Sequence, residues 1–176
     1  LIHGSARFVD ANHVHIEGGS AGSDRTISAS DFVIATGSRP RLLDSIDVDG
    51  HTIMTSDHIG SLEEFPKSLV ILGAGVVGCE FATIFANFGQ TKVNLIDRAE
   101  RILPFEDADV ARLCSTNLEA KGVTIHHRAK LISMRRVNGE VEYTLEYATG
   151  GRETIRVEKA MISIGRIPNT DNLDLD

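Results

Sequence analysis

Apolar and polar positions fall into successive patterns along the chain. Between residues 68 and 127, short continuous apolar runs alternate with longer segments that carry apolar residues at helical spacing. The apolar runs occupy Ser68–Leu72, Lys92–Asp97 and Val123–His127. The helical segments occupy Val77–Phe88, before Gly89, and Asp107–Lys121, before Gly122. Continuous apolar strands are typical of a parallel sheet covered on both faces, so this region predicts a β-α-β-α-β unit of Rossmann-like α/β type.

The second predicted helix carries an apolar stripe that should face the core. The stripe consists of Val110, Leu113, Cys114 and Leu118. Asp107 stands at its beginning.

After residue 129 the apolar period changes to two, which predicts strands. Lys130–Val137 and Glu140–Tyr147 flank Asn138-Gly139, a strong hairpin signal, and Glu153–Val157 follows a second glycine turn. These three segments predict an antiparallel meander. Lys159–Ile164 is one more apolar strand, which stops at Gly165.

The first 67 residues predict a less regular arrangement. Strands are expected over Ala6–Asp10, His13–Glu17 and Asp31–Thr36, with a loop over Gly18–Asp24. Residues 38–67 predict mostly loop, with one short helix that Thr55-Ser56-Asp57 caps and Pro66 ends.

Two segments share one design. Val33–Pro40 and Met161–Pro168 both run from an apolar strand into a glycine, with a proline three residues later. The likeness favours two nucleotide-binding domains in a parent protein, of which one is whole in this chain.

Composition narrows the functional classes. The chain has 25 acidic against 18 basic residues, a formal charge of −7, and 5% aromatic residues with no Trp. This balance argues against a nucleic-acid partner or an anionic membrane surface, and no apolar run is long enough to span a membrane. Cys79 and Cys114 fit neither a disulfide framework nor a zinc site, so we expect both at core positions. We also expect the protein in a reducing compartment, the cytoplasm. His13 and His15 lack a third metal ligand.

The motif with chemical content is Gly73-Ala74-Gly75-Val76-Val77-Gly78, a G-x-G-x-x-G that follows an apolar strand and opens a helix. Gly73 permits the tight turn, Gly75 lets a pyrophosphate approach the backbone, and Gly78 lets the helix pack closely on the sheet. The helix N-terminus supplies free N–H groups and the positive end of a dipole. We therefore expect a dinucleotide here.

Three side chains around this loop bear on which dinucleotide binds. Asp97 ends the second strand, where an acidic residue accepts hydrogen bonds from the adenosine ribose and repels a 2′-phosphate. NAD is therefore expected rather than NADP, although the adjacent Arg98 is able to hold a 2′-phosphate. Glu80, in the first helical turn, either contacts the ribose or nicotinamide or simply stabilises the helix N-terminus.

Taken together, these motifs resemble those of the class I flavoprotein disulfide reductases, the pyridine nucleotide-disulfide oxidoreductase family. The matching segments are ATGSRP at Ala35–Pro40, PKSLVILGAGVVGCEFA at Pro66–Ala82, LID at Leu95–Asp97, RILPFEDAD at Arg101–Asp109 and ISIGRIPNT at Ile162–Thr170. They occur in the family's order over nearly the whole chain. The link at Phe88–Lys92 departs by one extra residue.

The resemblance implies a domain organisation and site residues. Residues 1–40 would be part of an FAD domain, 41–67 a linker, 68–170 an NAD(H)-binding domain, and 171–176 the return to the FAD domain. Thr36, Gly37 and Ser38 would contact FAD. The NAD site would comprise Gly73 through Gly78, Glu80, Asp97, Arg98, Leu131 and Gly165, with Leu131 against the adenine. No catalytic residue is expected within this chain.

The resemblance also implies a function. The family members most like this chain are the dihydrolipoamide dehydrogenases, in which this domain positions nicotinamide for hydride exchange with FAD. The parent would be a homodimer with a separate dimerisation domain, and the chain alone would be inactive. Soluble pyridine nucleotide transhydrogenases, other disulfide or metal-ion reductases, and a non-enzymatic NAD sensor are alternatives. The redox Cys pair that distinguishes the dihydrolipoamide dehydrogenases from the soluble transhydrogenases does not occur in this sequence.

Overall fold

The computed structural model describes residues 1–18 and 24–175, which form two compact units. Unit 1 comprises Leu1–Arg39 and the C-terminal stretch from Ile167, and unit 2 comprises Pro40–Arg166. The loop predicted over Gly18–Asp24 lies largely outside the described residues. Within the described part of the chain, no helix is long and apolar enough to cross a membrane.

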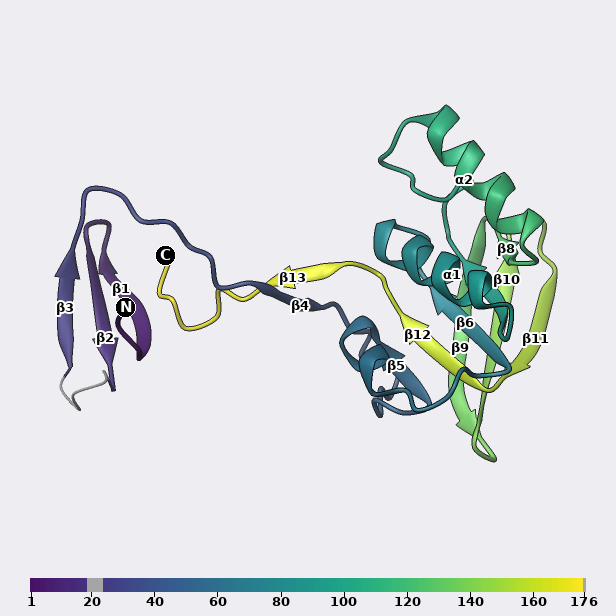
Figure 1. Ribbon diagram of the computed structural model, residues 1–176, viewed down its shortest axis with the longest axis horizontal. Coiled ribbons are helices and arrows are strands. Elements are labelled where there is room, and N and C mark those ends of the chain that lie inside the picture. The colour runs from purple at the N-terminus through teal and green to yellow at the C-terminus, as the bar shows by residue number, and fades with distance from the viewer. Residues whose placement is uncertain (19–23, 176) are drawn as a thin grey trace. The chain divides into compact units, whose positions relative to one another are not determined.

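Unit 2 is built on a five-stranded parallel sheet (Figure 1). Its strands are β5 (Ile53–Thr55), β12 (Lys159–Ile162), β6 (Ser68–Leu72), β7 (Lys92–Ile96) and β8 (Thr124–His126), in that spatial order. The Rossmann-like β-α-β-α-β unit is therefore confirmed. Strand β5 falls where the sequence predicts loop, because three residues are too few to show a period, although all three are buried.

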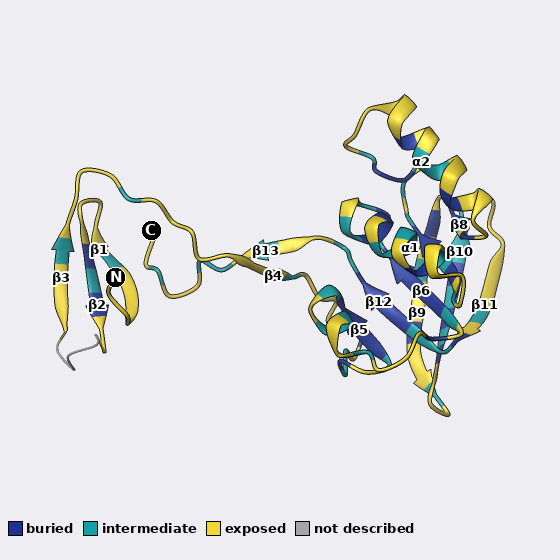
Figure 2. Cartoon of the chain, viewed as in Figure 1, coloured by how far each residue is buried: buried dark blue, intermediate teal, exposed yellow. Residues whose placement is uncertain are grey.

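Two different layers cover the sheet (Figures 1 and 2). Helices α1 (Val76–Phe88) and α2 (Ala108–Ala120) cover one face. The predicted antiparallel meander covers the other, as β9 (Ala129–Val137), β10 (Glu140–Tyr147) and β11 (Arg152–Val157). In β6 the buried side chains alternate accordingly: Leu69 and Ile71 pack in the helix-side core, and Val70 and Leu72 in the meander-side core.

Helix α2 corrects the predicted stripe. Ala111 and Leu118 are buried and Cys114 packs against the helix-side core, whereas Val110 is 54% and Leu113 62% exposed. Each residue turns a helix by about 100°, so a face centred on 111, 114 and 118 leaves 110 and 113 outside it. The predicted stripe left out Ala111, whose side chain is small, and wrongly included the larger Leu113.

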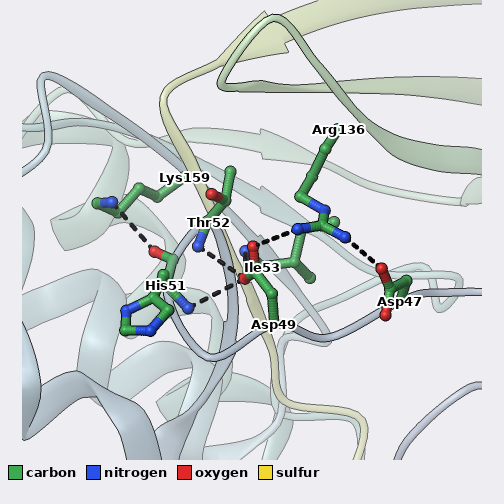
Figure 3. A network of polar contacts seen from close by, with 7 residues as sticks. All are labelled: Asp47, Asp49, His51, Thr52, Ile53, Arg136 and Lys159. Atoms are coloured by element: carbon green, nitrogen blue, oxygen red, sulfur yellow. Dashed lines mark hydrogen bonds and ion pairs between the residues drawn. The ribbon is translucent and has the colours of Figure 1, made fainter.

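A network of polar contacts fixes the loop before β5 (Figure 3). One carboxylate oxygen of Asp49 accepts the N–H groups of His51, Thr52 and Ile53 at 3.0, 2.8 and 2.9 Å. Its other oxygen pairs with Arg136 of β9 at 2.9 Å. Arg136 also pairs with Asp47, and Lys159 donates to the His51 carbonyl at 3.0 Å. The segment predicted as a linker is thus held against the meander and β12.

The short helix predicted after Thr55 is the 3-10 helix η1 (Ser56–Ser61). Thr55 caps it together with His58, whose ring Nδ1 lies 2.9 Å from the Thr55 hydroxyl oxygen. The helix ends at Ser61, so the prediction that Pro66 ends it was wrong.

Unit 1 contains the antiparallel strands β1 (Ser5–Asp10), β2 (His13–Glu17) and β3 (Arg25–Ser28). The strand predicted over Asp31–Thr36 does not form, and Val33 is 94% exposed. A strand requires a neighbour for its backbone groups, and the described residues provide none there. The chain passes between the units twice, through β4 (Ser38–Pro40) and β13 (Arg166–Pro168), which pair as a two-stranded sheet.

Candidate functional site

The glycine motif lies where the strand order of the sheet reverses. From β6 the chain proceeds outward through β7 to β8, whereas β12 pairs with the opposite edge of β6. In open α/β sheets, ligands bind at the carboxyl ends of strands at such a switch point. The Gly73 N–H donates to the Ile96 carbonyl at 2.9 Å and the Ser163 N–H to the Leu72 carbonyl at 2.9 Å. These bonds bring the ends of three strands together around the turn.

The three glycines of the motif have different surroundings. A Cβ at Gly78 would lie 1.9 Å from the Gly73 carbonyl oxygen, so the helix could not pack against the turn. A Cβ at Gly73 would lie 2.5 Å from the Ser163 carbonyl oxygen, and Gly73 also has a φ of +103°. A Cβ at Gly75 would meet nothing within 4 Å. Two glycines thus serve packing, and Gly75 leaves open space beside the backbone.

A cavity of about 380 Å³ adjoins this open space. Seven predicted residues line it: Gly73, Gly75, Val76, Val77, Asp97, Arg98 and Gly165. Much of the remaining wall is apolar and comes from Leu72, Ile96, Ile162, Ile164, Pro104 and Phe105. Pro104 and Phe105 were not among the predicted site residues, although they belong to the RILPFEDAD segment that carries the family resemblance. An apolar cavity with a few polar groups suits a small-molecule ligand.

Helix α1 begins at the edge of the cavity. Gly75 is its N-cap, has extended backbone dihedrals and provides no side-chain cap. Because Gly75, Val76 and Val77 all line the cavity, the positive end of the helix dipole adjoins it. This arrangement can bind an anion such as a pyrophosphate.

Asp97 and Arg98 have unequal surroundings. One Asp97 carboxylate oxygen accepts the Ala74 N–H at 2.8 Å, and the other accepts the Ala99 N–H at 2.7 Å. Within residues 1–18 and 24–175, the Arg98 guanidinium makes no hydrogen bond or ion pair. The Asp97 carboxylate is therefore held in place, whereas the Arg98 guanidinium is available to a ligand.

Other predicted residues lie apart from the cavity lining. Ala74 and Gly78 are buried beneath the turn, and Leu131 packs at the margin of the meander-side core. Glu80 is exposed and lines a second cavity, of about 420 Å³, which residues of both α1 and α2 line. The nucleotide contacts of Glu80 and Leu131 stay predictions.

The residues predicted to contact FAD, Thr36, Gly37 and Ser38, all belong to unit 1, and Ser38 begins strand β4. The Thr36 hydroxyl donates to the Asn169 carbonyl at 2.5 Å, and the Asn169 N–H donates to the Gly37 carbonyl at 3.0 Å. Gly37 has a φ of +77°. The ATGSRP and ISIGRIPNT segments are thus joined by hydrogen bonds, while the FAD contacts of Thr36, Gly37 and Ser38 stay predictions.

The cysteines occupy packing positions, as predicted. Cys79 is buried, and burial raises the pKa of its thiol to about 12, so it is a poor nucleophile at neutral pH. Cys114 is partly buried, and both thiols are free. In the part of the chain that the structure describes, no group of three His, Cys, Asp or Glu residues is arranged to hold a metal ion.

Comparisons with known proteins give the family. A family model described as pyridine nucleotide-disulphide oxidoreductase matches residues 1–176. Soluble pyridine nucleotide transhydrogenase from Hahella chejuensis is 38% identical over 176 residues, which cover 100% of this chain and 37% of that protein. Dihydrolipoyl dehydrogenase from Bacillus subtilis is 34% identical over 165 residues, which cover 93% of this chain and 34% of that protein.

Solved structures agree with this grouping. LpdA from Mycobacterium tuberculosis superposes with a TM-score of 0.81 and 29% identity, covering 98% of this chain and 38% of that one. The HOCl-induced flavoprotein disulfide reductase RclA from Escherichia coli gives a TM-score of 0.73 and 29% identity, covering 97% of this chain and 37% of that one. The chain thus spans a little more than a third of the length of these relatives. With a family model matched along its whole length, the chain belongs to the pyridine nucleotide-disulphide oxidoreductase family.

Proposed function

We propose that unit 2 is the NAD(H)-binding domain of a dihydrolipoamide dehydrogenase-like flavoprotein, and that unit 1 is part of its FAD domain. The observation that carries this proposal is the G-x-G-x-x-G turn at the switch point, with Gly75 open to a cavity at a helix N-terminus. The parent would be a cytoplasmic homodimer. Free, buried Cys79 is in keeping with a reducing compartment.

The residues of unit 2 would bind and orient the dinucleotide. The N–H groups at the start of α1 would hold its pyrophosphate, and the apolar walls at Ile162 and Ile164 would exclude water from part of it. When bound, nicotinamide supplies the hydride exchange with flavin in proteins of this type. No residue of the chain is assigned to a chemical step.

NAD is the proposed nucleotide because Asp97 lies in the cavity wall with its carboxylate fixed. A 2′-phosphate near this carboxylate would be repelled. One observation favours the alternative of a transhydrogenase, which exchanges hydride between the two nucleotides. Arg98, which lines the same cavity, has no partner among the described residues and could bind a 2′-phosphate.

Calorimetric titration of the chain with NAD⁺ and NADP⁺ tests the proposal. We expect NAD⁺ to bind several-fold more tightly, and Gly75→Val to abolish binding by occupying the space beside the turn. Gly151→Val is a matched control, because a Cβ there also meets nothing within 4 Å and Gly151 lies in the β10–β11 turn. Equal or tighter binding of NADP⁺ that Arg98→Ala removes would favour the transhydrogenase. Unchanged NAD⁺ affinity in Gly75→Val would contradict the assignment of the site.

A further inference from the structure

Asp97 joins four segments of unit 2. Its backbone N–H donates to the His126 carbonyl at the end of β8 at 3.1 Å, and its carbonyl accepts the Ala129 N–H at the start of β9 at 2.9 Å. Its side chain bonds the N–H of Ala74 in the glycine turn and the N–H of Ala99 in the loop that leads to α2. Hydrogen bonds therefore hold both the backbone and the side chain of Asp97 in place before any ligand binds.

The bond to Ala74 is the one that reaches the nucleotide site. Ala74 is fully buried, so water cannot replace the carboxylate as acceptor for its N–H. The Ala74 carbonyl in turn accepts the Leu103 N–H at 2.8 Å. Hydrogen bonds to an ionised acceptor are short and strong, so the bond that Ala74 donates to Asp97 helps to fix Ala74 between Gly73 and Gly75.

We infer that Asp97 is a positioning residue, whose carboxylate holds the glycine turn in the conformation that leaves Gly75 open to phosphate. This inference rests on the proposed function and deepens it. If Asp97 only accepted hydrogen bonds from the ribose, it would use the carboxylate lone pairs that Ala74 and Ala99 leave free, and its loss would affect the ribose contact alone. A positioning residue has a wider effect, because its loss disturbs the turn and weakens binding of the pyrophosphate group itself.

The distinguishing experiment compares ligands with and without the ribose hydroxyls. Asp97→Asn keeps the shape of the side chain but cannot accept both N–H groups. We expect it to weaken ADP, 2′-deoxy-ADP, 3′-deoxy-ADP and inorganic pyrophosphate alike, by at least tenfold, as measured by NMR titration. The inference is overturned if the variant weakens ADP while leaving pyrophosphate and the deoxynucleotides unchanged. Failure of the wild-type chain to bind any of these ligands would instead contradict the proposed function.

Amide hydrogen exchange in the unliganded chain gives a second measurement that needs no nucleotide. The amides of Ala74 and Ala99 should exchange slowly in the wild type and at least tenfold faster in Asp97→Asn. Fast wild-type exchange at both amides would overturn the inference, even if the variant did not fold.

Asp49→Asn is the matched control. Asp49 also accepts several loop N–H groups, but it does not line the nucleotide cavity. Its substitution should speed exchange at His51, Thr52 and Ile53 and leave every nucleotide affinity within twofold of the wild type. A comparable loss of nucleotide affinity in this control would show that general loosening of the fold explains the Asp97 effect, and would overturn the inference.

Discussion

At the scale of single residues, one amino acid serves three purposes within a six-residue motif. Gly73 provides a left-handed backbone against Ser163, Gly78 allows contact between helix and turn, and Gly75 leaves space for a ligand. The pattern of letters predicted all three positions. The motif itself indicates the packing role of Gly78, whose constraint is the Gly73 carbonyl. The close contact at Gly73 is with Ser163, which follows it by 90 residues, just after strand β12, and a local motif does not reveal it.

Substitutions at Gly78 and Gly75 should therefore have very different effects on stability. Gly78→Ala places a methyl group 1.9 Å from a carbonyl oxygen, and we expect a loss of about 2–4 kcal/mol in the free energy of unfolding. Gly75→Ala meets open space, so its effect should stay within about 1 kcal/mol. Urea denaturation followed by circular dichroism measures both. Similar losses in the two variants would contradict this description of the turn.

At the scale of elements, the sequence predicted regular segments well and short or context-dependent ones poorly. Strands β6 and β10 begin and end where predicted, because each carries several apolar residues in register. Strand β5 was missed, and Asp31–Thr36 was predicted wrongly as a strand. Strand formation depends on a neighbour that the local pattern does not reveal.

The site divides in the same way. Its glycine loop was found because the backbone geometry there requires particular residue types, and Asp97 and Arg98 were found from their spacing after that loop. Arg166, the third charged residue of the cavity wall, was not predicted. The apolar wall at Pro104 and Phe105 and the internal hydrogen bonds of Asp97 were not, because they depend on how the loop after β7 folds back on the glycine turn.

Helix α2 offers a test of its corrected orientation. Leu118→Ala should lower the free energy of unfolding by about 2–4 kcal/mol, since Leu118 is buried in the helix-side core. Leu113→Ala, the same change one face away, should alter it by less than about 0.5 kcal/mol, because Leu113 is 62% exposed. Thermal unfolding of both variants measures the two changes in the free energy of unfolding. Equal losses would contradict the orientation of α2 described above.

The loop before β5 should make stability depend on pH. Burial disfavours the Asp49 carboxylate, but the N–H groups of His51, Ile53 and Thr52, with Arg136, hold its pKa well below the ordinary value of 3.8. The ionised group therefore stabilises the fold above about pH 4, and this contribution is lost as the pH falls further. Asp49→Asn should cost about 1–3 kcal/mol at pH 7, with the difference from wild type shrinking by pH 3. A difference that stayed constant across this range would contradict the network as described.

At the scale of the whole molecule, the chain should bind NAD(H) without being a flavoenzyme. The sequence contains one G-x-G-x-x-G loop, and it lies at the proposed NAD site. Burial raises the pKa of the Cys79 thiol to about 12, which makes it a poor nucleophile and unsuited to a redox pair with Cys114. We expect protein incubated with excess FAD and desalted to show no flavin absorption and no NADH-dependent dye reduction. A retained flavin band with turnover would contradict the view that this chain is one domain and part of another.

The two crossings between the units have a consequence for how such a protein can be assembled. Unit 2 is one uninterrupted stretch, whereas unit 1 is made from two stretches on either side of it. The Arg41 N–H donates to the Gly165 carbonyl at 2.9 Å, so unit 2 begins and ends at nearly the same point. A coding segment for residues 40–166 could therefore be transplanted as a cassette into a surface turn of an unrelated host, whose own ends it would hardly separate. A nucleotide-dependent switch could be engineered into such a host, because binding would stabilise the guest and be felt at two adjacent covalent joints.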